Sequence, residues 1–113
     1  MKQYFAAMIA AAGCLATGSA FAEEAAGPVN ATEIVTTVCA MCHGEDGNKM
    51  LTPETPKIGG QKGDYLAKAL HDYKDGVRKN PIMGAVAAPL SAEAIDALAA
   101  YFAAQSSELY TLK

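Results

Sequence analysis

Three side chains that can bind metal ions or form covalent bonds stand within five positions of the chain. They are Cys39, Cys42 and His43, in the stretch CAMCH. Thiolates are nucleophiles and soft metal ligands, and a neutral imidazole is a common metal ligand. Their types and spacing therefore make this cluster the first candidate site.

Three ordinary explanations of the cluster fit the rest of the sequence poorly. A disulfide between Cys39 and Cys42 would close a very small loop and stabilise the fold little. Zinc usually takes four ligands, and only His71 is a further strong candidate, because Cys14 lies in a leader segment. A thioredoxin-like redox pair would be accompanied by alternating strands and helices, which the sequence pattern does not indicate.

The spacing C-x-x-C-H is the attachment signature of haem c, and this interpretation uses every residue of the cluster. The two thiols add across the vinyl groups of the porphyrin, and the adjacent imidazole binds the iron from one face. The sequence therefore predicts one covalently bound haem c at Cys39, Cys42 and His43.

The opposite face of the iron needs a second ligand, for which the stretch NPIMGAVAAP offers Met83. Met50 is a rival, but it lies only seven residues after His43, and from there the opposite face is hard to reach. His71 is another rival, although a histidine on a charged helix is more often solvated. Met83 is the preferred ligand, and its alternative role is that of an adaptable core side chain.

The N-terminal segment has the features of a secretory signal peptide. Lys2 precedes an apolar stretch and the small-residue sequence SAFA, so we expect cleavage after Ala22 and export to the periplasm. The apolar stretch is short for a membrane span, so no stable membrane insertion is expected after cleavage. The expected division is a signal peptide over 1–22, a flexible lead-in over 23–29 and one domain over 30–113.

Charge and composition restrict what the exported domain can bind. Removing Lys2 from the nine basic residues leaves eight against twelve acidic ones. The resulting net charge of about −4 disfavours nucleic acid, whose phosphates require a basic surface. Aromatic residues make up 7% of the chain and there is no Trp. A small domain filled largely by Ala buries little apolar surface unaided, so a bulky apolar cofactor would complete its core.

Local patterns predict an all-α fold that begins with a helix from about residue 31 to about residue 40. Asn30 followed by Glu33 resembles a capping box at its start. Helical spacing places Val35 and Val38 on or near one face of this helix.

Two further helices and two long loops complete the expected domain. The Gly- and Pro-rich stretch over 44–63 predicts a structured loop. A second helix is expected over 64–75 with its first residue as the cap, followed by a loop over 77–89. Ser91 should cap a final helix that ends at about Gln105. The prediction is three main helices connected by long loops.

The ordered set of motifs CAMCHGEDGN, TPKIGGQ and NPIMGAVAAPLS resembles the small class I cytochromes c, of the bacterial cytochrome c553 and c4 kind. The resemblance implies the class I cytochrome c fold around one haem. It implies thioether bonds at Cys39 and Cys42, and His43 as the proximal ligand. The distal ligand would be Met83, which stands eight residues before Ser91.

The resemblance also assigns supporting roles. Pro56 matches a proline whose carbonyl oxygen accepts the ring N–H of the proximal histidine. Thr55 departs from the larger apolar residue common at that position, so the haem would be less covered there. The terminal helices should cross through four packing residues, which are Ala31, Val35, Leu98 and Tyr101.

Ligation by histidine and methionine fills both axial positions of the iron and raises its potential relative to ligation by two histidines. The sequence therefore predicts a periplasmic carrier of single electrons between redox partner proteins, and not an enzyme. Two alternatives stay open, a cytochrome subunit of a larger oxidoreductase and a catalytic or sensory haem module with a labile distal Met. A positively charged middle segment could balance the haem propionates or steer an acidic partner; it contains Lys57, Lys62, Lys68, Lys74, Arg78 and Lys79.

Overall fold

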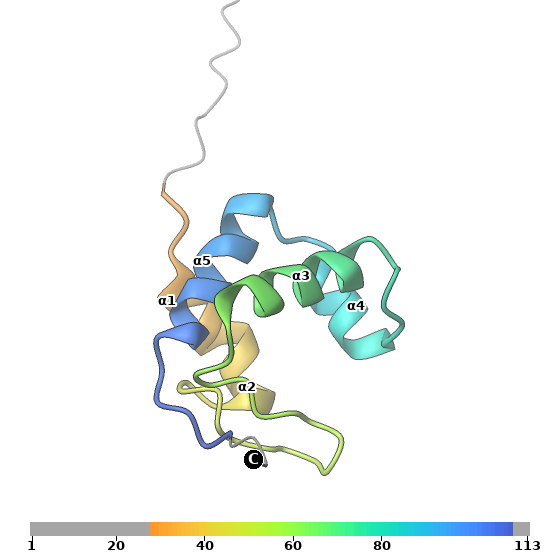
Figure 1. Cartoon of the computed structure of the whole chain (residues 1–113). Helices are drawn as coiled ribbons and strands as arrows, with labels where there is room; N and C mark the ends of the chain where they lie inside the picture. The colour runs from red at the N-terminus through yellow and green to blue at the C-terminus, as the bar shows by residue number, and fades with distance from the viewer. Residues whose placement is uncertain (1–27, 110–113) are drawn as a thin grey trace, which may run out of the picture.

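The computed structural model describes residues 28–109, and within them it contains helices and no strand (Figure 1). The helical elements are α1 (Ala31–Ile34), η1 (Val35–Cys39), α2 (Ala40–His43), α3 (Gly63–Lys74), α4 (Pro81–Ala87) and α5 (Ala92–Ala103). The all-α fold predicted from the sequence is confirmed. The expected signal peptide and most of the expected lead-in lie outside the described residues.

The elements α1, η1 and α2 follow one another without a break, so the first helical run extends to His43 and not to residue 40 as expected. The Asn30 side chain accepts a hydrogen bond from the Glu33 N–H at 3.2 Å, as half of the predicted capping box. The middle element, η1, is a π-helical turn, in which the N–H of Ala40 bonds the carbonyl of Val35. Gly44, with φ 76°, ends the run.

The π-helical turn carries the two valines that the sequence placed on or near one face. Val35 is fully buried in the core, whereas Val38 is 41% exposed and lines the cavity described below. The two side chains therefore have different surroundings.

Helix α3 begins and ends one residue earlier than predicted, and Asp64 does not cap it. The N-cap is Lys62, which makes no side-chain capping bond. Asp64 lies in the first turn, where its carboxylate accepts from the Tyr65 N–H at 2.8 Å and its charge complements the helix dipole. Gly76, with φ 73°, follows the helix and allows the chain to turn.

Helix α4 lies inside the stretch 77–89, so the prediction of a loop there was wrong. Asn80 is its N-cap, with Oδ1 accepting from the N–H groups of Ile82 and Met83, both at 3.0 Å. Pro81 occupies the first turn, where its missing N–H removes no helical bond. Met83 is therefore on a short helix, and not in a flexible loop.

Helix α5 packs across the first helical run and across α3, and this crossing forms the core (Figure 1). Ser91 caps α5 by accepting from the Ala94 N–H at 3.1 Å, and the helix ends at Ala103, two residues before the expected end. The largest fully buried side chains are Val35, Ile95 and Leu98. The four residues predicted at the crossing are all part of this core or in contact with it. Val35 and Leu98 are buried in the core, and Ala31 and Tyr101 pack against it.

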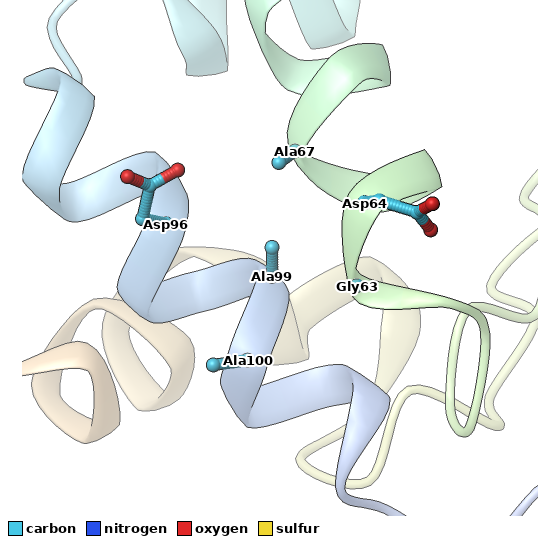
Figure 2. A pocket seen from close by; sticks show the side chains of 6 residues that line it. All are labelled: Gly63, Asp64, Ala67, Asp96, Ala99 and Ala100. Atoms are coloured by element: carbon cyan, nitrogen blue, oxygen red, sulfur yellow. The ribbon is translucent and has the colours of Figure 1, made fainter.

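Small residues let α3 and α5 approach closely. Figure 2 shows Gly63 and Ala67 of α3 beside Ala99 of α5 at a shallow hollow, which Ala100 also lines. A Cβ atom at Gly63 would lie 3.5 Å from the Cβ of Ala103, which is ordinary contact. Small residues thus form this part of the contact between the two helices, while Leu66 of α3 packs in the same buried cluster as Ile95, Leu98 and Phe102 of α5.

Within residues 28–109, no single helix is long and apolar enough to cross a membrane. Helices α4 and α5 pass that test of length and composition only as a pair, with a bend of 116° between them.

Candidate functional site

A cavity of about 520 Å³ lies on the side of α3 and α4 that faces the first helical run. Each of the four helical parts of the chain contributes to its wall, together with the loop over 51–61. All five residues singled out from the sequence line it, namely Cys39, Cys42, His43, Pro56 and Met83. Residues up to 44 positions apart in the chain are thereby brought to one site.

His43 is a buried side chain, 7% exposed, at the end of α2. Its Nδ1 lies 2.9 Å from the carbonyl oxygen of Pro56. A carbonyl oxygen can only accept, so Nδ1 carries the ring proton and donates it. The other ring nitrogen, Nε2, then keeps its lone pair, which is the state required of a metal ligand.

Cys39 and Cys42 are free thiols that are both half-buried. They are three positions apart in a helical run, a spacing that brings side chains to the same side of a helix. Burial raises the pKa of the Cys39 thiol, with a smaller opposing effect of a backbone hydrogen bond. Both thiols therefore stand beside the cavity without a disulfide between them.

Met83 reaches the cavity from α4, an element separate from the one that carries His43. The rival ligands are placed differently. Met50 is 47% exposed, and neither it nor His71 lines the cavity. Met41, also exposed, is likewise outside it. Among the methionines of residues 28–109, Met83 alone is positioned to ligate a group inside the cavity.

The cavity wall is largely apolar, and sequence reasoning identified only part of it. Four side chains of α3, which are Tyr65, Leu66, Leu70 and Tyr73, line the cavity. Further apolar lining side chains were not predicted as site residues: Ile34, Val38, Leu51, Ile58, Ile82, Val86, Leu90 and Phe102. In the sequence these residues are recognisable only as apolar residues near the motifs. That property does not show whether a side chain lines a cavity or belongs to the core.

One cation stands at the cavity without a carboxylate partner among residues 28–109. Arg78 lies over the Tyr73 ring, 4.9 Å from its centroid, and its Nη1 donates to the Tyr65 hydroxyl at 3.5 Å. The hydrogen bond that Arg78 donates to Tyr65 is the main cause that raises the pKa of Arg78. The other lining cation, Lys57, is paired with Glu108.

The residues present fit a porphyrin. Two thiols and an imidazole stand together, a thioether reaches in from a separate helix, apolar side chains form the walls, and a cation is available for the carboxylates. No group of three or more His, Cys, Asp or Glu side chains in residues 28–109 could hold a bare metal ion. The arrangement suits a metal that brings its own ring of ligands.

Comparison with known sequences gives a consistent result. Residues 29–106 match the family described as Cytochrome c. Over 82 residues the chain is 43% identical to cytochrome c4 of Pseudomonas aeruginosa, which covers 73% of this chain and 40% of the relative. Over 97 residues it is 36% identical to the cytochrome subunit of sulfide dehydrogenase of Chlorobaculum tepidum, which covers 84% of this chain and 86% of the relative.

A third relative is the thiosulfate dehydrogenase electron acceptor of Stutzerimonas stutzeri, 45% identical over 62 residues. The match covers 55% of this chain and 29% of that protein. The chain thus spans less than half the length of two of these three relatives.

Proposed function

The chain belongs to the cytochrome c family, and we propose that it carries single electrons between redox partner proteins with its haem iron held by His43 and Met83. The observation that supports this most strongly is the convergence of five residues, distant in sequence, on one apolar cavity. Covalently bound haem c is the cofactor of the family. When bound, it supplies an iron that changes by one electron between ferrous and ferric states.

Cys39 and Cys42 hold the porphyrin through thioether bonds in this proposal. Their position beside His43 would bring the iron of the attached haem within reach of the imidazole. The hydrogen bond from Nδ1 to the Pro56 carbonyl, at 2.9 Å, fixes the tautomer and the orientation of the ring. Pro56 is thus the residue that orients the proximal ligand, and the only group it needs for this is its backbone oxygen.

Met83 would supply the second protein ligand to the iron, from a helix separate from the one that carries His43. Its placement on α4, with Asn80 as the cap of that helix, holds the thioether in one region. An iron held by both side chains would have no free position at which oxygen or peroxide could react. This is the physical basis for proposing a carrier and not an enzyme.

Arg78 is the residue we assign to the haem propionates. Its position over Tyr73 and beside the Tyr65 hydroxyl directs a delocalised charge toward the cavity. A guanidinium pairs well with carboxylates, because it presents donors in a planar fork. Lys62, Lys74 and Lys79, which form no ion pair among residues 28–109, are assigned to steering an acidic redox partner, an effect that raised salt should weaken.

The ligand assignment is tested by removing candidate thioethers one at a time. In the oxidised haem protein, Met83→Ala should abolish the weak near-red absorption band of Met-to-ferric-haem coordination, lower the reduction potential and allow carbon monoxide to bind the reduced iron. Met50→Ala and His71→Ala are the matched controls, and they should keep the band. Loss of the band in Met50→Ala with its retention in Met83→Ala would refute the assignment.

A second form of the same function is that of a permanently bound subunit. The relative from Chlorobaculum tepidum is matched over most of its length, and it is named as a subunit of a dehydrogenase. Isolation of this protein from its native cells would separate the two forms. A free carrier elutes alone at the size of one domain, whereas a subunit elutes with a larger oxidoreductase.

The proposed location is the periplasm, with the signal peptide cleaved after Ala22. Covalent attachment of haem in bacteria takes place outside the cytoplasm, which agrees with the leader. Sequencing the N-terminus of the haem-bearing protein tests this, since it should begin at Glu23.

A further inference from the structure

Asn48 is a buried polar side chain, 9% exposed, that has no part in the haem site proposed above. Its Nδ2 donates to the carbonyl oxygens of Ser106, at 2.9 Å, and of Asp46, at 3.4 Å. Its Oδ1 accepts from the backbone N–H of Glu108 at 3.3 Å. Both N–H donors of the Asn48 amide and one acceptor site of its oxygen are therefore used. Two of the three bonds connect Asn48 to the C-terminal residues Ser106 and Glu108.

Backbone hydrogen bonds hold the segment 58–60 between the parts of the chain that Asn48 joins. The Gly47 carbonyl oxygen accepts from the first two N–H groups of this segment, at 2.7 and 3.0 Å. The N–H of Gly60 donates to the carbonyl of Phe102, at the end of α5, at 2.8 Å. The segment is thus fixed on one side by the loop after His43 and on the other by the C-terminal part of the domain.

Pro56 precedes this segment by two residues, and its carbonyl accepts the ring N–H of His43. We propose that Asn48 is a positioning residue, which fixes the Pro56 carbonyl by tying the C-terminal segment 104–109 to the loop over 44–49. The inference rests on the proposed function in one respect, that His43 is the proximal ligand. It extends that function, because a side chain outside the cavity would then help to fix the orientation of the His43 ring.

The Asn48 amide is closely packed against the backbone of Gly59. A Cβ at Gly59 would lie 2.7 Å from Nδ2 and 2.9 Å from Oδ1 of Asn48, so the segment 58–60 has little room to move relative to the Asn48 amide. Aspartate has the right length, but its carboxylate would face the Ser106 carbonyl without a proton to donate. The position requires a side chain that both donates and accepts.

The consequence concerns the basicity of the proximal imidazole. A firm hydrogen bond from Nδ1 to a carbonyl makes the imidazole a stronger donor to the iron and favours the ferric state. If Asn48 is lost, the Pro56 carbonyl moves more freely and that bond weakens. The reduction potential should then rise, and the ring proton should exchange with solvent more easily.

The test compares two Asn→Ala variants of the haem-loaded protein. Asn48→Ala should raise the reduction potential and speed the exchange of the His43 ring proton, followed by proton NMR of the reduced state, by about tenfold, the equivalent of one hydrogen bond. Asn30→Ala is the control, because it removes the cap of α1 and lowers stability without touching the Pro56 segment. Equal exchange rates in the two variants, or an unchanged rate in Asn48→Ala, would overturn the proposal.

A second pair keeps the test decisive if Asn48→Ala does not fold. Glu108→Pro and Glu108→Ala both lose the ion pair with Lys57, but only the proline variant loses the N–H that bonds Asn48. Faster ring-proton exchange in Glu108→Pro than in Glu108→Ala supports the proposal, and equal rates contradict it. Failure of the proposed function would instead be visible in the unaltered protein, as missing thioether haem or missing ligation by His43.

Discussion

The helix crossing and the cavity side of this domain differ in how far their apolar side chains are buried. At the crossing, Ile95 and Leu98 are fully buried by other side chains of the same chain. On the cavity side, Leu51 is 55% exposed and Ile82 is 69% exposed, although both line a hollow. One region completes its own packing, and the other presents an apolar wall that another group must cover.

This difference explains how so small a chain can fold around a cofactor. The crossing of α1 and α5 needs only residues that the sequence already supplies, and it fixes the first helical run that carries Cys39 and His43. The cavity side gains its stability when the porphyrin covers the apolar wall, because binding to the folded state alone favours folding. The attachment motif lies where the two regions meet.

The largest expected effect is the loss of the cavity-side structure when the haem cannot be attached. The double variant Cys39→Ala with Cys42→Ala, made in cells with a haem-attachment system, should hold no haem after acid–acetone extraction. Circular dichroism should show a chain that has lost most of its helix, since much of its buried apolar surface is missing. A haem-free chain with full helix content and a sharp unfolding transition would contradict this comparison of the two regions.

A pair of truncations should separate the two regions quantitatively. Ile95, which is fully buried and does not line the cavity, belongs to the crossing alone, and Ile95→Ala should lower the free energy of unfolding of the haem protein by about 2–5 kcal/mol. Leu51→Ala removes a half-exposed side chain and should cost about 1 kcal/mol or less. Denaturant unfolding followed by circular dichroism measures both, and equal costs would show that the cavity side is as closely packed as the crossing.

The crossing is the region that the sequence predicts well. Ser91 and Asn30 are strong capping signals, and the helical spacing of Ile95, Leu98 and Phe102 defines a buried face without any tertiary information. These signals are local, which is why the first and last helices were placed within a few residues. The attachment motif was equally local.

The cavity side contains the features that the sequence did not reveal. The stretch around α4 contains Pro81, Gly84 and Pro89, so it was predicted to be a loop, whereas Asn80 and Pro81 form a cap and a first turn. The π-helical turn over Val35–Cys39 has no signal in the helix propensity of its residues. Asn48 was missed because its partners lie 58 and 60 positions away.

A pair of cap removals sharpens the comparison further. Asn80 caps α4, a helix of seven residues in which Ala87 alone is buried, whereas Ser91 caps the well-buried α5. Both substitutions by Ala should lower the free energy of unfolding by about 0.5–2 kcal/mol. Only Asn80→Ala should also weaken the near-red band and speed carbon monoxide binding, because it loosens the helix that holds Met83. A weakened band in Ser91→Ala of the same size would indicate that α4 has no separate role.

The smallest expected effect concerns acid and the loop over 44–49, which connects the two regions. The backbone N–H of Asn48 donates to the Asp46 carboxylate at 3.0 Å, and this bond is the main cause that lowers the pKa of Asp46. A carboxyl whose pKa is lower in the folded state stabilises the fold above its unfolded pKa, and the contribution is lost as pH falls through the folded value.

Asp46→Asn removes the charge but keeps an acceptor oxygen, so the variant should be less stable than the unaltered protein near neutral pH. Below about pH 4 that difference should shrink, because protonation removes the same charge from the unaltered protein. Denaturant midpoints of the two proteins across this range measure it, and because Asp46 is exposed the difference should be small throughout. A difference that stays constant with pH would mean that the loop is held by Asn48 and its backbone partners alone, without a contribution from the Asp46 charge.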